Sequence, residues 1–293
     1  MTVMLAAMAS EEKAMDLELL KETPPWEWPE GTGAGLRKLL EDDGASADDR
    51  LIAAELASDI TVVDEPMTRA LLALVRREDL PEALRCQAAI ALGPCLEEGD
   101  TMGFDEDPCL SEVAHGRVVD ELRQLYLDAG VPDDVRRRIL EASVRAPQPW
   151  HADAVREAHA SDRAGWRLTA VFCMEYVRGF DEQILEALRS EEPELVFHAV
   201  CAAGSQELDA AWDAITALAT DAKADQELRL VAIDATVAIR PAGVRRALLE
   251  LIDDDDQAVV EAAEEAMELA DEIAELSDRG DWDDDDDDDE QLN

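Results

Sequence analysis

Aromatic residues are scarce in this sequence. Phe, Trp and Tyr make up 4% of its 293 residues, although 47% of the residues are hydrophobic. Alanine and leucine therefore supply most of the apolar side chains, a composition that suits closely packed helices better than strands. No stretch approaches the ~18 apolar residues of a membrane-spanning helix, and the first residues lack a basic leader. We therefore expect a cytoplasmic protein without a membrane partner.

Basic residues are also few, and lysine is rare among them. Lysine and arginine together number 26 against 71 acidic residues, which gives a formal net charge of −45. The lysines are Lys13, Lys21, Lys38 and Lys223. Such an excess of acid opposes attraction to a phosphate backbone, so we expect no nucleic-acid partner. The acidity fits either a function with a basic partner or adaptation to salt or to a GC-rich genome.

Cysteine pairs, metal motifs and phosphate loops are missing. The five cysteines form no CxxC pair, and their odd number favours structural thiols in a reducing compartment. The four histidines show no metal-ligand spacing, and no GxGxxG, GxxxxGK[ST] or GxSxG motif occurs. We therefore predict no catalytic residues and no cofactor. The cysteines are Cys86, Cys95, Cys109, Cys173 and Cys201, and the histidines are His115, His151, His159 and His198.

What the sequence does contain is a short pattern that recurs, an apolar residue followed by arginine at the head of an apolar run. It occurs in EALRCQAAIALG (82–93), DDVRRRILEAS (133–143), AGWRLTAVFCM (164–174) and QELRLVAIDAT (226–236). When the runs are aligned on the second residue of this pattern, where arginine usually stands, the intervals between successive aligned residues are 35, 51, 31, 30, 32 and 31 residues. Regular spacing of this kind is typical of a repeat protein. The aligned positions are Arg50, Arg85, Arg136, Arg167, Phe197, Arg229 and Val260.

Each interval has the pattern of two helices. The first helix is amphipathic, whereas the second is apolar on more than one face, which favours a helix packed between neighbours. The long interval leaves about 20 residues beyond one repeat. We assign them to an insertion at 96–116 and expect a mobile loop that folding does not require. The seven predicted repeats are 33–60, 63–98, 117–147, 150–179, 181–206, 208–240 and 242–272.

Leu84-Arg85 followed by Ala88, Ala89, Ala91, Leu92 and Gly93 resembles the second helix of the HEAT-repeat superfamily, in particular the short bacterial units of phycobilisome lyases. The resemblance implies an all-α fold, an α-solenoid superhelix of about seven two-helix repeats. It leaves two functions open, because such arrays have many activities. One is a non-enzymatic protein–protein scaffold or adaptor, and the other is a lyase-type subunit for a bilin or similar prosthetic group. Charge disfavours a third, a HEAT-like DNA glycosylase.

The recurring arginine is predicted to be structural. Its methylenes can cover the neighbouring repeat, while its guanidinium pairs with a turn carboxylate such as Asp133 or Glu82. Phe197 and Val260 stand where other repeats have arginine, so those two repeats should lack the contact.

Both ends of the chain differ from the repeats. Residues 1–32 predict an N-terminal helix and a Trp/Pro-rich cap, in which Trp26 and Trp28 either seal the first repeat or form a partner-binding pair. The solenoid is expected over 33–276. Residues 277–293 contain a run of aspartates, which predicts a disordered acidic tail that attracts a partner with a basic surface or acts as a solubilising segment.

Charge is unevenly distributed along the chain. Residues 1–116, 117–178 and 179–293 carry net charges of −17, 0 and −28. The neutral middle combines basic and aromatic side chains, and we take five of them as candidate contacts for a partner: Arg137, Arg138, Arg145, Trp150 and His151. Within the insertion, Asp100, Asp105 and Asp107 resemble a calcium loop only loosely, because the closing Glu is missing. The partner's identity and the oligomeric state do not follow from the sequence.

Overall fold

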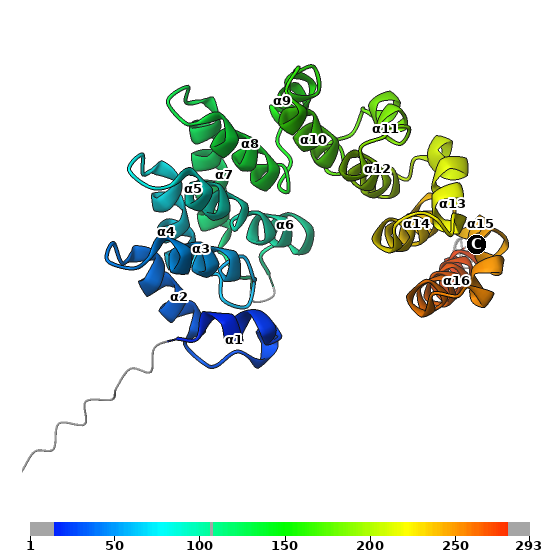
Figure 1. Cartoon of the computed structure of the whole chain (residues 1–293), viewed down its shortest axis with the longest axis horizontal. Helices are drawn as coiled ribbons and strands as arrows, with labels where there is room; N and C mark the ends of the chain where they lie inside the picture. Colours follow the sequence, from blue (N-terminus) through cyan, green and yellow to red (C-terminus); the bar gives the residue numbers. More distant parts are fainter. Residues whose placement is uncertain (1–14, 106–107, 281–293) are drawn as a thin grey trace, which may run out of the picture. The chain divides into compact units, whose positions relative to one another are not determined.

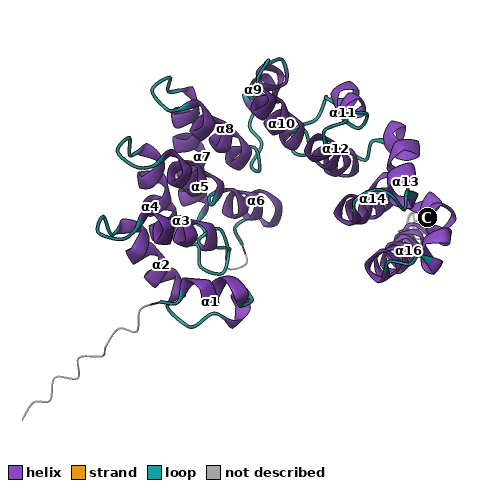
Figure 2. Ribbon diagram, in the orientation of Figure 1, coloured by secondary structure: helices purple, strands orange, loops and turns teal. Residues whose placement is uncertain are grey.

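The computed structural model describes residues 15–105 and 108–280, and the regular secondary structure in those ranges is entirely helical (Figure 2). None of the helices in the described part is long and apolar enough to cross a membrane. The chain divides into two compact units, Met1–Ala146 and Pro147–Asn293. Each unit is a stack of helix pairs, and all seven predicted repeats correspond to a pair. The predicted all-α repeat fold is therefore confirmed.

The N-terminal unit contains three of the helix pairs. Their first helices pack in the order α2, α4, α7, and their second helices in the order α3, α5, α8 (Figure 1). A further helix, α6, packs on α7 and α8. The bounds are α1 Leu17–Glu22, the 3-10 helix η1 Pro25–Glu27, α2 Thr32–Glu41, α3 Ala47–Leu56, α4 Glu65–Arg76, α5 Glu82–Ile90, α6 Gly93–Met102, α7 Glu112–Leu127 and α8 Asp133–Ser143.

The C-terminal unit contains the other four pairs. Its second helices pack in the order α10, α12, α14, α16, so α14 lies between two neighbours and also contacts α13 and α15. This explains why α14 is apolar on several faces, with Ala232, Ile233, Ala235 and Val237 all buried. The bounds are α9 His151–His159, α10 Ala164–Cys173, α11 Asp181–Ala187, α12 Pro193–Ser205, η2 Asp209–Ala211, α13 Trp212–Thr220, α14 Gln226–Ile239, α15 Pro241–Leu248, η3 Leu249–Asp253 and α16 Gln257–Gly280.

The recurring arginine is the fourth residue of its second helix, and in four repeats it donates to a carbonyl ten residues earlier. That carbonyl belongs to the next-to-last residue of the first helix, where the helix has no partner for it. A guanidinium there satisfies the oxygen and complements the negative end of the helix dipole. The bonds are Arg50 Nη2 to Leu40 O at 2.8 Å, Arg85 Nε to Val75 O at 2.9 Å, Arg136 Nε to Tyr126 O at 2.8 Å and Arg229 Nε to Ala219 O at 3.2 Å.

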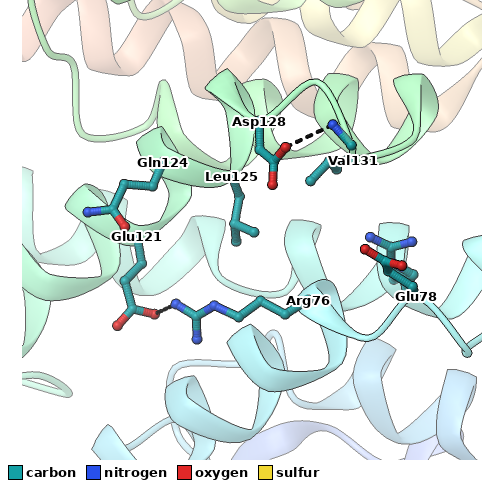
Figure 3. Close-up of a pocket in the computed structure, with 9 residues that line it drawn as sticks. Arg76, Glu78, Glu121, Gln124, Leu125, Asp128 and Val131 are labelled. Carbon is teal, nitrogen blue, oxygen red and sulfur yellow. Dashed lines mark hydrogen bonds and ion pairs between the residues drawn. The ribbon is translucent and has the colours of Figure 1, made fainter.

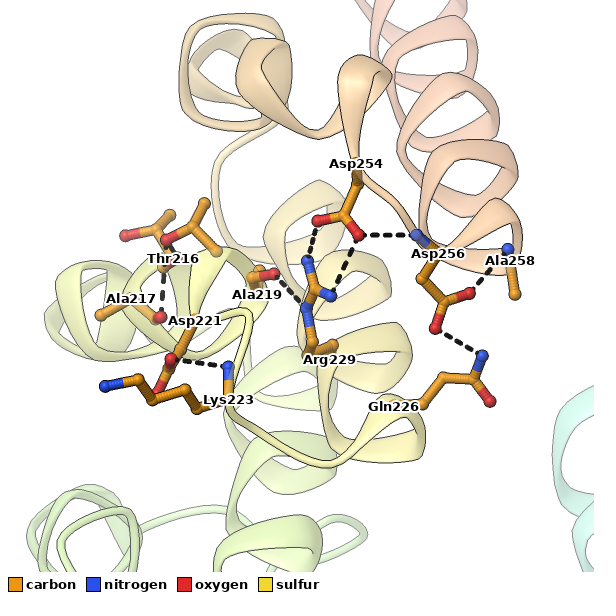
Figure 4. Close-up of polar contacts among 11 residues, drawn as sticks. Thr216, Ala217, Ala219, Asp221, Lys223, Gln226, Arg229, Asp254, Asp256 and Ala258 are labelled. Atoms are coloured by element: carbon orange, nitrogen blue, oxygen red, sulfur yellow. Dashed lines mark hydrogen bonds and ion pairs between the residues drawn. The ribbon is translucent and has the colours of Figure 1, made fainter.

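This geometry corrects the predicted partners of the arginine. The predicted carboxylates, Asp133 and Glu82, are not its partners; the first contact is a backbone carbonyl across the turn within the same repeat. Arg167 departs from the rule, because its Nη1 donates to Ser161 O at 3.3 Å in the preceding turn. Arg229 adds a carboxylate from the following repeat, since Asp254 accepts from Nη1 at 3.4 Å and from Nη2 at 2.6 Å (Figure 4).

The insertion predicted at 96–116 adds a helix, α6, after the second pair, so it is not the unstructured loop that the sequence indicated. Its first residues belong to α6, and Leu110 is a core residue that is only 2% exposed. Gly99 is buried against His115, close enough that a Cβ would lie 2.6 Å from the imidazole ring. His115 Nε2 in turn lies 3.1 Å from Leu96 O, so the two ends of the insertion hold each other. Deleting the segment is therefore expected to destabilise the unit.

The cap and the tail also differ in part from the prediction. Trp28 Nε1 donates to Leu20 O at 3.0 Å and to Thr23 O at 2.9 Å, which closes the end of α1. Trp26 is 80% exposed and so does not seal the first repeat. Helix α16 continues to Gly280, past the predicted start of the tail at 277. The acidic run and residues 1–14 lie outside the described residues.

Candidate functional site

Three of the predicted contact residues, Arg137, Arg138 and Arg145, form ion pairs within the N-terminal unit. Arg137 is 14% exposed and lies 3.3 Å from Glu141 and 3.6 Å from Asp134. Arg138 donates to the same Glu141 carboxylate at 2.5 Å, and Arg145 pairs with Glu97 of α6. The charges of these arginines are therefore balanced by the chain itself. Their role in binding a partner stays a prediction.

Trp150 and His151 belong to the other unit. His151 is fully buried at the start of α9, and its Nδ1 accepts a hydrogen bond from Gln148 N at 2.8 Å. Burial lowers the pKa of His151 to about 4, so the ring is neutral near pH 7. The Trp150 ring lies over it at 3.9 Å between centroids. His151 is a core residue, which corrects its assignment as a contact for a partner.

The predicted calcium loop stays a prediction. Asp100 and Asp105 are both exposed, and Asp107 lies outside the described residues. Within residues 15–105 and 108–280, no group of three His, Cys, Asp or Glu side chains is arranged to hold a metal ion.

Four aromatic side chains gather instead on α10 and α12 of the C-terminal unit and in the turn that follows α10. The Phe172 and His198 rings meet edge to face at 5.5 Å, and Phe197 meets His198 at 5.6 Å. Tyr176 extends the group at 5.6 Å from Phe172. All four are half-buried. We call this group the aromatic surface; it consists of Phe172, Tyr176, Phe197 and His198.

Carboxylates lie near Cys201, which is one helical turn after Phe197 on α12. Burial, then the charges of Glu175 and Asp234, raises the pKa of the Cys201 thiol on α12 to about 11. Although Asp234 keeps contact with solvent, the atoms packed around its carboxyl and then Glu265 raise its pKa above the ordinary value. Glu175 follows the end of α10, Asp234 lies on α14 and Glu265 lies on α16, and these effects show that each is near the group whose pKa it raises. We call these three residues the acidic rim.

The N-terminal unit contains a cavity of about 300 Å³ between the α4–α5 turn and α7 with its following turn (Figure 3). Arg76 and Glu121 pair at one side of it, and Leu125 projects toward it from α7. Arg85 and Gly130 line it as well. Because Arg85 is only 4% exposed, this cavity reflects incomplete packing between two repeats at least as much as a site for a ligand.

The sequence predictions missed the aromatic surface. One signal was available: Phe197 replaces the recurring arginine in a chain with few aromatics. Phe172 and Tyr176 are four residues apart, a spacing that predicts one side of a helix, but α10 ends at Cys173 and Tyr176 lies in the following turn. Exposure depends on the stacking of α10 and α12, which the sequence of one helix does not contain.

No family model matches the chain, and no curated protein matches it in sequence. Among solved structures, the chain is similar to human deoxyhypusine hydroxylase in complex with glycerol, with 19% identity, 87% of this chain and 88% of that chain covered, and a TM-score of 0.40. It is also similar to YibA of Escherichia coli, with 13% identity, coverage of 86% and 95%, and a TM-score of 0.44. Likeness at this level carries no argument about the function of this chain.

Proposed function

We propose that the chain is a protein-interaction scaffold whose C-terminal unit binds a basic, amphipathic segment of another protein. The observation that carries the proposal is the aromatic surface beside the acidic rim. Half-buried aromatic rings are the residues that most often dominate binding at protein interfaces. In a chain with 4% Phe, Trp and Tyr, three of these residues together with His198 in one group are a concentrated source of binding energy.

The charge of the acidic rim favours a basic partner. The raised pKa of Asp234 reflects a carboxylate that is partly desolvated and repelled by Glu265, so an incoming cation relieves an existing cost. Residues 179–293 carry a net charge of −28, which steers a basic partner toward this unit. A lysine or arginine can also stack on the faces of Phe172 or Tyr176.

Fluorescence anisotropy tests this proposal with a labelled amphipathic peptide that presents lysines on one face and leucines on the other. The unmodified chain should bind it saturably, and binding should weaken as salt is raised. The matched peptide with glutamate in place of lysine should not bind. Equal binding of both peptides would overturn the electrostatic part of the proposal.

Two sets of variants locate the binding surface. Phe172→Ala with Phe197→Ala should weaken peptide binding by at least about tenfold, because truncated hot-spot aromatics typically cost 2 kcal/mol or more. Asp234→Asn with Glu265→Gln should weaken it roughly fivefold at low salt and much less at high salt.

The matched control removes the same charge from the first-helix side of the same unit. Glu186→Gln on α11 with Asp213→Asn on α13 should leave the dissociation constant within about twofold, since both side chains are exposed away from the aromatic surface. Equal losses from the control and the rim variants would mean that only total charge matters, and the assigned surface would be wrong.

The lyase alternative rests on the sequence resemblance alone. It predicts a shifted absorbance band when the protein is mixed with a tetrapyrrole, and such a band would replace the scaffold proposal.

A further inference from the structure

We infer that the N-terminal unit contains a binding site for a phosphate group, in a cavity lined by four arginines. The cavity has a volume of about 360 Å³ and lies between α2, α3 and α4. One carboxylate, Glu41, lines it as well. The lining itself has four guanidinium groups against this one carboxylate, and the carboxylates that pair with three of the arginines, Asp43, Asp79 and Glu65, lie outside the lining. We call it the arginine cavity, and its arginines are Arg37, Arg50, Arg69 and Arg77.

Two of the arginines form the fixed part of the cavity. Arg50 is 4% exposed; its Nη2 donates to Leu40 O at 2.8 Å, and its Nη1 has an ion pair with Asp43 at 3.7 Å, beyond hydrogen-bond distance. The Nε of Arg50 is buried without a hydrogen-bond partner in the described part of the chain. Arg77 is held by Asp43 and Asp79, so its position is set by the chain itself.

The other two arginines have more N–H donors than hydrogen-bond partners. Arg37, on α2, makes no hydrogen bond or ion pair with the residues that the structure describes. Arg69, on α4, has a single long contact with Glu65 at 3.5 Å. Glu65 also accepts from the Ser111 hydroxyl at 2.8 Å and lies 3.9 Å from Arg117, so its charge is shared among three groups. Arg37 and Arg69 are therefore free to turn toward a ligand.

The number and type of donors select a phosphate monoester or inorganic phosphate. A carboxylate has two oxygens and is satisfied by one guanidinium fork. A phosphate dianion has three or more acceptor oxygens and matches the forks of several arginines at once. A cavity of about 360 Å³ takes a small molecule or one phosphorylated side chain, and it is too small for a folded domain. The site is separate from the aromatic surface and does not depend on the proposed function.

Isothermal titration of the full chain with inorganic phosphate tests the inference, with phosphorus NMR as a second readout. The chain should bind phosphate saturably, sulfate should compete, and acetate at the same ionic strength should not. Arg37→Gln and Arg69→Gln should each weaken binding by about tenfold or more, the effect of losing one charged hydrogen bond. Both side chains reach solvent, so thermal unfolding should be unchanged and the loss can be assigned to binding.

Arg123→Gln is the matched control, because Arg123 is an exposed arginine of α7 in the same unit and does not line the cavity. It should leave phosphate affinity unchanged. A parallel titration with glycerol phosphate and with a phosphoserine peptide identifies the source of the phosphate by which of the two binds more tightly. Absence of saturable binding, or equal losses from Arg123→Gln and Arg69→Gln, would overturn the inference.

Discussion

Arg229 and Arg85 occupy the same position in two repeats, yet they meet different surroundings. Both donate Nε to the end of the preceding helix, at 3.2 Å and 2.9 Å. Arg229 also holds Asp254 of the following repeat with both terminal nitrogens (Figure 4). Arg85 makes no such pair with the described residues, and it lines the cavity of about 300 Å³ in Figure 3.

The difference comes from one position in the next repeat. Asp254 stands three residues before the first residue of α16, and Gly130 stands three residues before the first residue of α8. Glycine has no side chain to offer, so the space next to Arg85 stays open. For Arg50 of the first repeat, the corresponding residue is Asp79 of the second repeat, whose pKa is lowered chiefly by Arg77 and slightly by Arg50. The arginine therefore fixes the four repeats in which it reaches the carbonyl, and the residue three positions before the next second helix sets how firmly such a repeat holds its neighbour.

The largest expected effect is that of Arg229→Ala. It removes the partner of Ala219 O and leaves Asp254 without its bidentate contact, which should cost about 3 kcal/mol of unfolding free energy. Urea unfolding followed by circular dichroism measures the loss. Arg245→Ala is the control, since Arg245 pairs with Asp271 where both side chains are more than half exposed, and it should cost below about 1 kcal/mol. Equal losses would contradict the role of burial.

Arg85→Ala should cost less than Arg229→Ala, about 2 kcal/mol, because one charged hydrogen bond and the packing of a buried stem are lost. Arg137→Ala, next to the recurring position of α8, should cost below about 1 kcal/mol, since its pairs with Asp134 and Glu141 are local. Thermal unfolding of the three variants gives the order directly. An Arg85→Ala variant as stable as the unmodified chain would show that the carbonyl contact contributes nothing.

Lowering the pH should change the stability costs of Arg229→Ala and Arg85→Ala in different ways. The hydrogen bond from Arg229 holds the pKa of Asp254 below its ordinary value, so the pair is intact above the unfolded value near 4. Protonation as pH falls through the lower folded value removes that stabilisation. The cost of Arg229→Ala should therefore shrink as the pH falls from 6 to 3. The cost of Arg85→Ala, which involves a carbonyl, should stay constant; a parallel decrease would implicate other carboxylates.

The repeats could be predicted from the sequence because the apolar run and its arginine recur at intervals near 31 residues. The partner of the arginine could not, since Val75 and Arg85 are joined only by the geometry of the turn between two helices. Helix α6 was missed because Pro94 and Gly99 weaken its helical pattern, whereas burial of Cys95 and Leu96 against neighbours stabilises it. The arginine cavity was hidden within a segment of net charge −17, because sums of charge do not record which side chains face one another.

A double-mutant cycle between Arg85 and position 130 tests the central claim most directly. Gly130 is not among the glycines with positive φ, and an added Cβ would lie 3.2 Å from the Asp128 carboxylate, so the Asp128 side chain must shift slightly to admit aspartate. Gly130→Asp should stabilise the chain by about 1 kcal/mol when Arg85 is present. In an Arg85→Ala background the same change should destabilise it, because the new carboxylate then faces Asp128 alone. An interaction energy of zero in urea unfolding would contradict the claim that a carboxylate at this position sets the hold between repeats.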